Sequence, residues 1–265
     1  MWFYVKRVLR KGGVPVSVSA IQSQRLFNSL TSGKRINSAA DDAAGLAISE
    51  KLLAQVNGYN VGTNNAADGI NLLNVADGSL STMQDSLQRI RELAVQAGNG
   101  IYSASDKELI QMEIDGLKAS IQDAAKNTNF NTMKLLDGSM ASLSLATNPS
   151  GGGLEIQMDS STLESLGIAD FSVMGDFSLD DIDNAIQAVS KARSRMGAKT
   201  NVLNHTINYN ENAGLNLMAA NSRIRDTDYG KAITDKNRDD ILSQYRIFAM
   251  KAQMNNNAGV LKLLG

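Results

Sequence analysis

The strongest helical signal in the chain is LNVADGSLSTMQDSLQRIRELAVQA, residues 73–97. Its small and apolar side chains recur at alternating steps of three and four, the spacing of a coiled-coil seam. The seam consists of Leu73, Ala76, Leu80, Met83, Leu87, Ile90, Ala94 and Ala97. In the same register it continues backwards over Gly69, Ala66, Gly62 and Tyr59. The small residues there would let a neighbouring helix approach closely.

The seam predicts a helix from about Asp41 to Ala97. Asn37 or Ser38 is the expected cap, because both are common helix-capping residues. Asp41 and Asp42 would then lie in the first turn, where carboxylates complement the helix dipole.

Two further segments carry a helical period. The first follows the turn at Asn99-Gly100, has Ser105 as its expected cap, and steps through Ile110, Ile114, Leu117, Ile121 and Ala124. The second steps through Ile182, Ala185, Val189, Ala192 and Met196 and can be followed to about Asn221. Because only a short turn precedes it, the first segment can fold back antiparallel on the helix ending at Ala97. Together the three segments predict a bundle.

The middle of the chain changes to alternation, which favours strands. Residues 142–145 and 154–158 alternate, and the turn sequence Asn148-Pro149-Ser150-Gly151-Gly152-Gly153 joins them. We expect a hairpin there that is accessory to the helices. The fold class is therefore mainly α, a long antiparallel helical rod or coiled-coil bundle with a small β-hairpin region in the middle.

One more helix is expected near the C-terminus, from about Asp239 to Asn255. It presents Ile241, Tyr245, Phe248 and Ala252 on one face. This apolar face needs a partner, and we expect the helical segments at the two chain ends to pair.

Composition excludes several function classes. There are 26 basic and 27 acidic residues and no cysteine, so neither a global field for nucleic acid nor a thiol chemistry is expected. No apolar run approaches the ~20 residues needed to cross a bilayer, so no membrane partner is expected. The basic start, with Lys6, Arg7, Arg10 and Lys11, is not followed by a convincing apolar segment, which argues against a cleaved signal peptide.

No residue pattern indicates catalysis, a metal or a cofactor. His205 is the single histidine, and nothing near it supplies a nucleophile. The pairs Asp41-Asp42, Asp180-Asp181 and Asp239-Asp240 lie at or near predicted helix starts, where dipole complementarity explains them. We therefore expect no enzyme.

One surface stretch invites a partner. Arg89 and Glu92 are three residues apart and can form a helix-surface ion pair. Leu93 beside them is expected to be exposed and to add apolar area to the same patch.

Several motifs together resemble bacterial flagellins. LTSGKRIN (30–37) and ADDAAGLAI (40–48) resemble the N-terminal signature of that family, and LQRIRELAVQ (87–96) is a second match. NFN (129–131), KLL (134–136), ILSQ (241–244) and VLKLL (260–264) complete the resemblance, which covers about residues 26–138 and 178–265. The start of the chain, Met1 to Val16, departs from the family pattern.

The resemblance implies a subunit that polymerises into the flagellar filament. It implies terminal core-tube helices over 1–36 and 231–265, a helical rod over 37–138 and 178–230, and a short β-rich hairpin region over 139–177. Two alternatives stay open: a hook-filament junction protein, and an assembly-defective flagellin acting mainly as an immune ligand.

Partners and location also follow from the resemblance. Self-assembly with other copies would use Ile241, Tyr245, Phe248, Ala252, Leu261 and Leu264. Toll-like receptor 5 would bind Leu87, Gln88, Arg89, Glu92, Leu93, Gln96 and Glu113. A flagellar export chaperone and a cap protein are further expected partners. The protein would be secreted through the flagellar type III pathway, without a cleaved signal peptide, into the extracellular flagellum.

Overall fold

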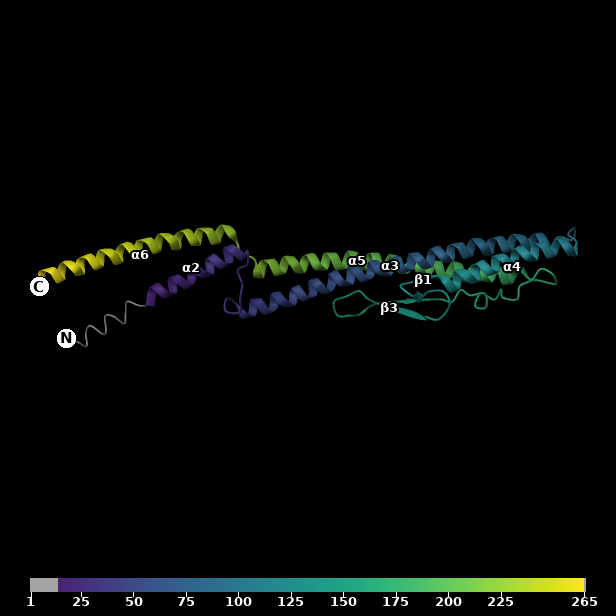
Figure 1. Cartoon of the computed structure of the whole chain (residues 1–265), viewed down its shortest axis with the longest axis horizontal. Helices are drawn as coiled ribbons and strands as arrows, with labels where there is room; N and C mark the ends of the chain where they lie inside the picture. The colour runs from purple at the N-terminus through teal and green to yellow at the C-terminus, as the bar shows by residue number, and fades with distance from the viewer. Residues whose placement is uncertain (1–13, 265) are drawn as a thin grey trace. The chain divides into compact units, whose positions relative to one another are not determined.

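The computed structural model describes residues 14–264, with side chains placed for residues 23–256 and 258. The basic residues Lys6, Arg7, Arg10 and Lys11 lie outside the described residues. Long helices dominate (Figure 1): α2 (Val14–Ser32), α3 (Ala43–Ala97), α4 (Ala104–Asn127), α5 (Leu179–Arg225) and α6 (Tyr229–Leu264). Four short strands complete the fold: β1 (Asn129–Phe130), β2 (Met133–Lys134), β3 (Ser142–Ala146) and β4 (Gly153–Gln157). The predicted mainly α fold class is confirmed.

The described chain divides into two compact units. One unit joins the residues up to Ala54 with those from Asn216 onward, and the other comprises Gln55–Leu215. The boundaries predicted near residues 36 and 230 therefore fall inside the first unit. Polar contacts explain the difference, because Arg225 bonds Glu50 through a 2.7 Å ion pair and its carbonyl accepts the Arg35 N–H at 2.7 Å.

In the first unit, α2 packs against α6, so the predicted pairing of the chain ends is confirmed. The end of α2 meets the start of α6, because the Tyr229 hydroxyl donates to the Leu30 carbonyl at 3.1 Å. The Thr227 N–H donates to the Gly33 carbonyl at 2.9 Å. The two helices are consequently antiparallel, and the end of α2 and the start of α6 lie together.

The cap predicted for α3 is wrong. The Asp42 carboxylate accepts the Gly45 N–H at 2.8 Å, which makes Asp42 the residue that caps the helix. Asn37 and Ser38 instead donate their N–H groups to Asp41 at 3.2 and 3.0 Å. These bonds, with that from Ser38 N–H the largest, lower the pKa of Asp41. Asp41 thus closes the turn that precedes the helix and Asp42 caps the helix itself, so α3 begins at Ala43 and not at Asp41.

The cap predicted for α4 is also wrong, by two residues. Ser103, not Ser105, accepts the Asp106 N–H, and the Asp106 carboxylate accepts the Ser103 N–H at 3.0 Å. This reciprocal capping box requires an acceptor three residues after the cap, and Asp106 stands three residues after Ser103. Glu108 stands in the same relation to Ser105, so spacing alone did not separate the two candidates.

The last helix begins ten residues earlier than predicted. Asp228 accepts the Lys231 N–H at 3.1 Å and caps α6 at Tyr229. Asp239 and Asp240 therefore lie inside the helix rather than at its start, and Asp240 pairs with Lys236 at 2.6 Å. The explanation of this acidic pair by the helix dipole is accordingly wrong, whereas Asp180 and Asp181 do occupy the first turn of α5.

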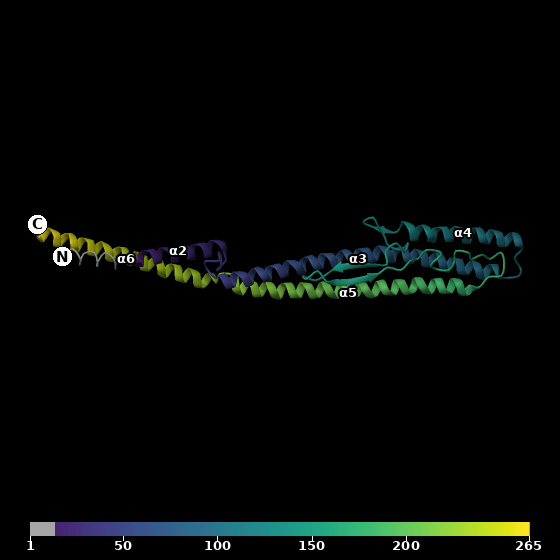
Figure 2. The ribbon, with the colours of Figure 1, turned by 90° about the horizontal axis from the view of Figure 1, so that it is seen from below.

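The second unit is a bundle in which α3 lies between α4 and α5 (Figure 2). The predicted seam residues of α3 from Leu73 to Ala97 are buried, and so are all five predicted for α5. On α4, Ile110, Ile114 and Ile121 are buried, while Leu117 and Ala124 are partly buried against the same core. Ion pairs join the helices at Arg91–Asp183 (2.6 Å) and Arg193–Asp77 (2.9 Å). Arg91 near the end of α3 pairs with Asp183 at the start of α5, and Asp77, earlier in α3, pairs with Arg193, later in α5, so these helices are antiparallel.

The middle of the chain contains the predicted hairpin and one that was not predicted. Strands β3 and β4 pair antiparallel in the register Ser142↔Gln157 to Ala146↔Gly153. Strands β1 and β2 pair across a two-residue turn in which Asn131 (φ 47°) and Thr132 (φ 68°) are left-handed. Such a turn suits a tight hairpin, and Asn131 was its only sequence signal.

Gly62 and Gly69 of α3 receive the β3–β4 hairpin, which was not expected there, as well as the side chains of Asn210 and Leu203 from the neighbouring helix α5. A Cβ at Gly62 would lie 2.3 Å from the Thr147 carbonyl oxygen, and one at Gly69 would lie 2.3 Å from the Leu145 side chain. The amides of Asn65 and Asn210 donate to the Ala146 and Thr147 carbonyls at 2.7 and 2.8 Å. Glycine thus allows main-chain contact, and asparagine satisfies the carbonyls brought there.

The expectation that the middle is accessory to the helices is wrong. Ile156 on β4 and Ile168 and Val173 in the loop after it are fully or almost fully buried in the bundle core. The strands occupy only the first part of residues 139–177, and the rest is a non-repetitive segment. Lacking a period, this segment gave no signal of burial.

Candidate interaction surfaces

The residues predicted to bind a receptor lie on α3 and α4 of the second unit. Five of them are exposed: Gln88, Arg89, Glu92, Gln96 and Glu113. The other two are buried, Leu87 at 0% and Leu93 at 2% exposure. The predicted set therefore separates into a polar surface and an apolar layer beneath it.

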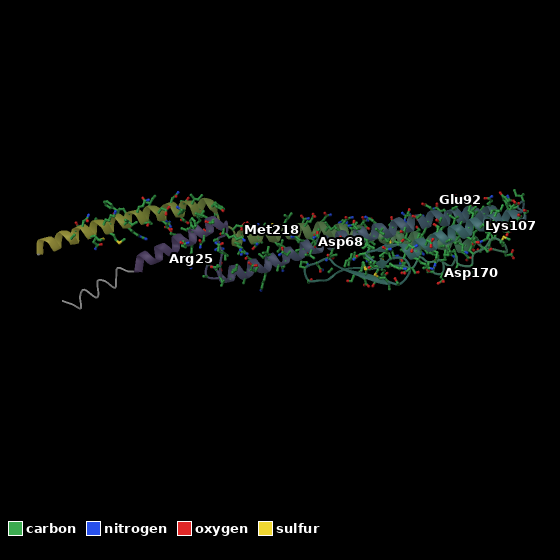
Figure 3. All side chains as sticks on the ribbon, viewed as in Figure 1. Arg25, Asp68, Glu92, Lys107, Asp170 and Met218 are labelled. Carbon is green, nitrogen blue, oxygen red and sulfur yellow. The ribbon has the colours of Figure 1, made fainter. Side chains whose placement is uncertain are left out.

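Arg89, Glu92 and Glu113 form what we call the α3–α4 polar cluster. The Arg89 guanidinium donates through Nη2 and Nε to Glu113 Oε1 at 2.8 and 3.0 Å, and through Nη1 to Glu92 Oε2 at 3.2 Å. Glu92, labelled in Figure 3, is three residues from Arg89 on α3, and Glu113 comes from the antiparallel neighbour α4. The hydrogen bond to Glu113, followed by that to Glu92, raises the pKa of Arg89. Because Arg89 and Glu113 are about half exposed and Glu92 is 68% exposed, the pairs contribute little stability and stay accessible.

The expected exposure of Leu93 is wrong. A single seam on α3 would leave Leu93 outside, but α3 packs against two helices and therefore buries two adjoining faces. Leu93 follows Arg89 by four residues, so it lies on the same side of α3, where α4 covers it. It supports the polar cluster from below.

Tyr102 joins the surface although the sequence gave no reason to select it. Its hydroxyl accepts the Gln96 side-chain amide at 3.0 Å. Tyr102 stands in the turn between α3 and α4, where no periodicity applies, so only the tertiary structure places it beside Gln96.

The predicted self-assembly residues lie on α6 in the first unit. Ile241, Tyr245 and Phe248 are 66%, 70% and 71% exposed, and Ala252 is exposed. We call these four residues the α6 stripe. Leu261 and Leu264 belong to the same helix, but their side chains lie outside the described ones.

The α6 stripe projects away from the packed side of its helix. Among the described side chains of α6, Ala232 is the buried one. At about 100° per residue, all four stripe residues fall within roughly 40° of the point opposite Ala232. The half-buried residues Asp235, Lys236 and Asp239 lie on the Ala232 side. The stripe is thus a contiguous apolar surface with no partner inside the described chain.

The described residues form no further candidate site beside these two surfaces. The described residues contain no cluster of metal-ligating side chains, and His205 is exposed on α5. An open groove of about 800 Å³ in the first unit is lined by mutually paired charges, including Arg25 with Asp41 and Arg238 with Asp235. None of the described helices is long and apolar enough to span a membrane.

Comparison with known protein families gives matches over both helical regions. The model of the bacterial flagellin N-terminal helical region matches residues 18–141, and that of the bacterial flagellin C-terminal helical region matches residues 179–264.

Several proteins are similar over most of their length. A flagellin of Halalkalibacterium halodurans is 39% identical over 94% of both chains. A flagellar filament 33 kDa core protein of Treponema phagedenis is 38% identical, covering 91% of this chain and 92% of that protein. A flagellin of Bacillus subtilis is 38% identical with the same coverage. A flagellar hook-associated protein from Vibrio parahaemolyticus aligns with a TM-score of 0.59 at 14% identity, over 70% of this chain and 100% of that one, which shows likeness of fold alone.

Proposed function

The chain belongs to the bacterial flagellin family, and from this premise we propose that it polymerises into a flagellar filament through the α6 stripe. This is a structural family and not an enzyme family. The observation that supports the proposed contact is the exposure of Tyr245 and Phe248 on the side of α6 opposite Ala232.

Burial of the stripe by other copies would stabilise the polymer. Three large apolar side chains two-thirds or more exposed present a surface that water solvates poorly. Full burial of such a side chain contributes about 1.5–3 kcal/mol relative to exposure. A helix exposed on almost all sides needs contacts of this size to stay ordered.

The test is assembly of the double variant Tyr245→Ala, Phe248→Ala. Produced in a flagellin-deficient bacterium, the wild-type chain is expected to form filaments visible by electron microscopy, and the double variant short filaments or none. Gln253→Ala, on the Ala232 side of the same helix, is the matched control and should assemble normally. Normal filaments from the double variant would reject the α6 stripe as the contact.

The same experiment separates the proposed filament subunit from the two alternatives. A wild-type chain that stays monomeric under all polymerising conditions would favour the assembly-defective flagellin that acts mainly as an immune ligand. A hook-filament junction protein would support no long filament either. The relatives at 34–39% identity are flagellins and filament core proteins, whereas the hook-associated structure shares the fold alone.

We further propose that the exposed surface of α3 and α4 binds Toll-like receptor 5. Gln88, Arg89, Glu92, Gln96 and Glu113 would make the contacts, and the buried Leu87 and Leu93 would hold the surface in place. The support is geometric, because Arg89 is fixed by carboxylates from two helices and still half exposed. A preorganised guanidinium loses little entropy on binding, as expected of an anchor residue.

Receptor binding is tested on the soluble chain with Arg89→Ala and Glu113→Ala. Each is expected to weaken binding without lowering the melting temperature, because exposed ion pairs contribute little stability. Arg223→Ala, an exposed arginine in the first unit, serves as a control for loss of charge. Unchanged affinity of both variants would remove the polar cluster from the interface.

Export and its partners form the last part of the proposal. We propose secretion through the flagellar type III pathway to the extracellular flagellum, with an export chaperone shielding the α6 stripe and a cap protein guiding assembly. The absence of cysteine suits a chain that travels unfolded. Extracellular protein should disappear in a strain without that pathway, and its persistence there would refute the route.

A further inference from the structure

Asn99 and Gly100 form an Asn-Gly dipeptide in the exposed turn between α3 and α4. We propose that this turn is a site of spontaneous deamidation assisted by its own geometry, in which Asn99 is converted to aspartate and isoaspartate. The chain has one other Asn-Gly dipeptide, Asn57-Gly58, which lies inside α3 and provides an internal comparison.

The turn brings the reacting groups together. The Ile101 N–H donates to the side-chain oxygen of Asn99 at 3.3 Å, which folds the carboxamide over the following peptide bond. Among the described residues, the Gly100 N–H donates no hydrogen bond. Nothing lies within 4 Å of the position where Gly100 would carry a Cβ. The nitrogen of Gly100 is therefore unprotected and unhindered next to Asn99 Cγ.

The reaction needs only water. The Gly100 nitrogen loses its proton to solvent base and attacks Asn99 Cγ, forming a C–N bond. Negative charge develops on the Asn99 side-chain oxygen, where the Ile101 N–H already donates and stabilises it. The side-chain amide nitrogen takes up a proton from solvent, its bond to Cγ breaks and ammonia leaves, giving a cyclic succinimide. Water then opens either carbonyl, which yields aspartate or isoaspartate.

The second dipeptide lacks this arrangement. Gly58 stands in the continuous hydrogen-bond ladder of α3, and its N–H is held along the helix axis. The hairpin also packs here, because a Cβ at Gly58 would lie 2.7 Å from Pro149 Cβ. Attack on Asn57 therefore requires local unwinding of a packed helix, which lowers the reactive population.

Conversion would change the joint between the two helices. A carboxylate at residue 99 follows the carboxyl end of α3, where the helix dipole is already negative. Isoaspartate would in addition insert a main-chain methylene into the turn that holds Tyr102 beside Gln96.

The experiment incubates the full chain at mildly alkaline pH, folded and in urea, and follows tryptic peptides by mass spectrometry. Arg91 and Lys107 bound a peptide that contains Asn99. In the folded chain, Asn99 should convert about tenfold or more faster than Asn57, because only the latter must await local opening. In urea the two rates should converge. Equal rates in the folded chain, or slower conversion of Asn99 when folded than in urea, would overturn the proposal.

Two glycine variants complete the test. Gly100→Ala has room for its methyl group, which should nevertheless hinder attack by the adjacent nitrogen and suppress conversion. Gly98→Ala, with only ordinary contacts around its Cβ, is the matched control and should convert at the wild-type rate. Wild-type conversion in Gly100→Ala would contradict the mechanism even if the rates in urea behave as expected.

Discussion

Gly62 is a residue at which one methyl group would meet main chain. We expect Gly62→Ala to lower the free energy of unfolding by about 1–3 kcal/mol, because its Cβ would press on the Thr147 carbonyl and overpack the hairpin. Gly78→Ala, in the same helix with nothing within 4 Å of the new atom, should instead stabilise by about 1 kcal/mol. Urea denaturation of both variants measures the contrast. If the two variants were equally stable, the hairpin would be able to shift away from the new methyl group at no cost in stability.

Leu93 gives a second residue-scale prediction. Because its side chain is buried between α3 and α4, Leu93→Ala should destabilise the chain by about 2–5 kcal/mol through the cavity left behind. The exposed Val95→Ala is the control and should change stability by less than about 0.5 kcal/mol. Thermal unfolding distinguishes the two, and a wild-type melting temperature for Leu93→Ala would place that residue at the surface.

At the scale of elements, the capping box of α4 predicts a pH effect. Hydrogen bonds from the Ser103 hydroxyl and then the Ser103 N–H hold the pKa of Asp106 below its ordinary 3.8. The folded state thus binds this proton less readily than the unfolded state. The stabilisation by the Asp106 carboxylate is therefore complete at a pH above its ordinary pKa of 3.8, and it is lost as the pH falls through the lowered pKa of the folded state.

The variant Asp106→Asn should accordingly melt at a lower temperature than wild type at neutral pH, and the difference should shrink towards about pH 2. Glu108→Gln, an exposed carboxylate of the same helix without a hydrogen-bond partner among the described residues, is the control. A difference that stays constant with pH would assign the loss to something other than the carboxylate.

Helices and strands could be predicted from the sequence where apolar residues recur with a regular period. The seams of α3, α4 and α5 and the alternation in β3 and β4 follow from repeated burial of one face, which sequence records directly. The first residues of the helices could not be predicted, because Ser103 and Ser105, or Ser38 and Asp42, have similar capping chemistry. The choice depended on which backbone N–H groups the neighbouring turn presents.

At the scale of the molecule, the exposure of α6 predicts labile ends in the free monomer. Arg246 and Lys251 lie on a helix whose side chains are exposed from Ile241 to Asn256. Arg193 is partly buried and bonds Asp77 and Gln84 in the second unit. Trypsin should therefore cut α6 before α5, and polymerisation should protect α6. Mass spectrometry of timed digests measures the order, and a monomer that resists cleavage in α6 would contradict it.

The two candidate surfaces differ in how much of each could be predicted from the sequence. The α6 stripe could be named from sequence, because a helical face with Tyr245 and Phe248 on it is visible in the period alone. That it faces away from Ala232 required the pairing of α2 with α6. The polar cluster needed more, because Glu113 reaches Arg89 only when α4 folds back on α3.

By itself, then, the sequence determined the helices, their apolar faces, the β3–β4 hairpin and the resemblance to flagellins, since each is written in local spacing or contiguous motifs. Only the tertiary structure decided that Leu93 is buried, that Ile168 and Val173 complete the core, and that the glycines of α3 receive a hairpin. The physical reason is that burial depends on how many neighbours an element has. That number is a property of the packed chain and leaves no period in a single segment.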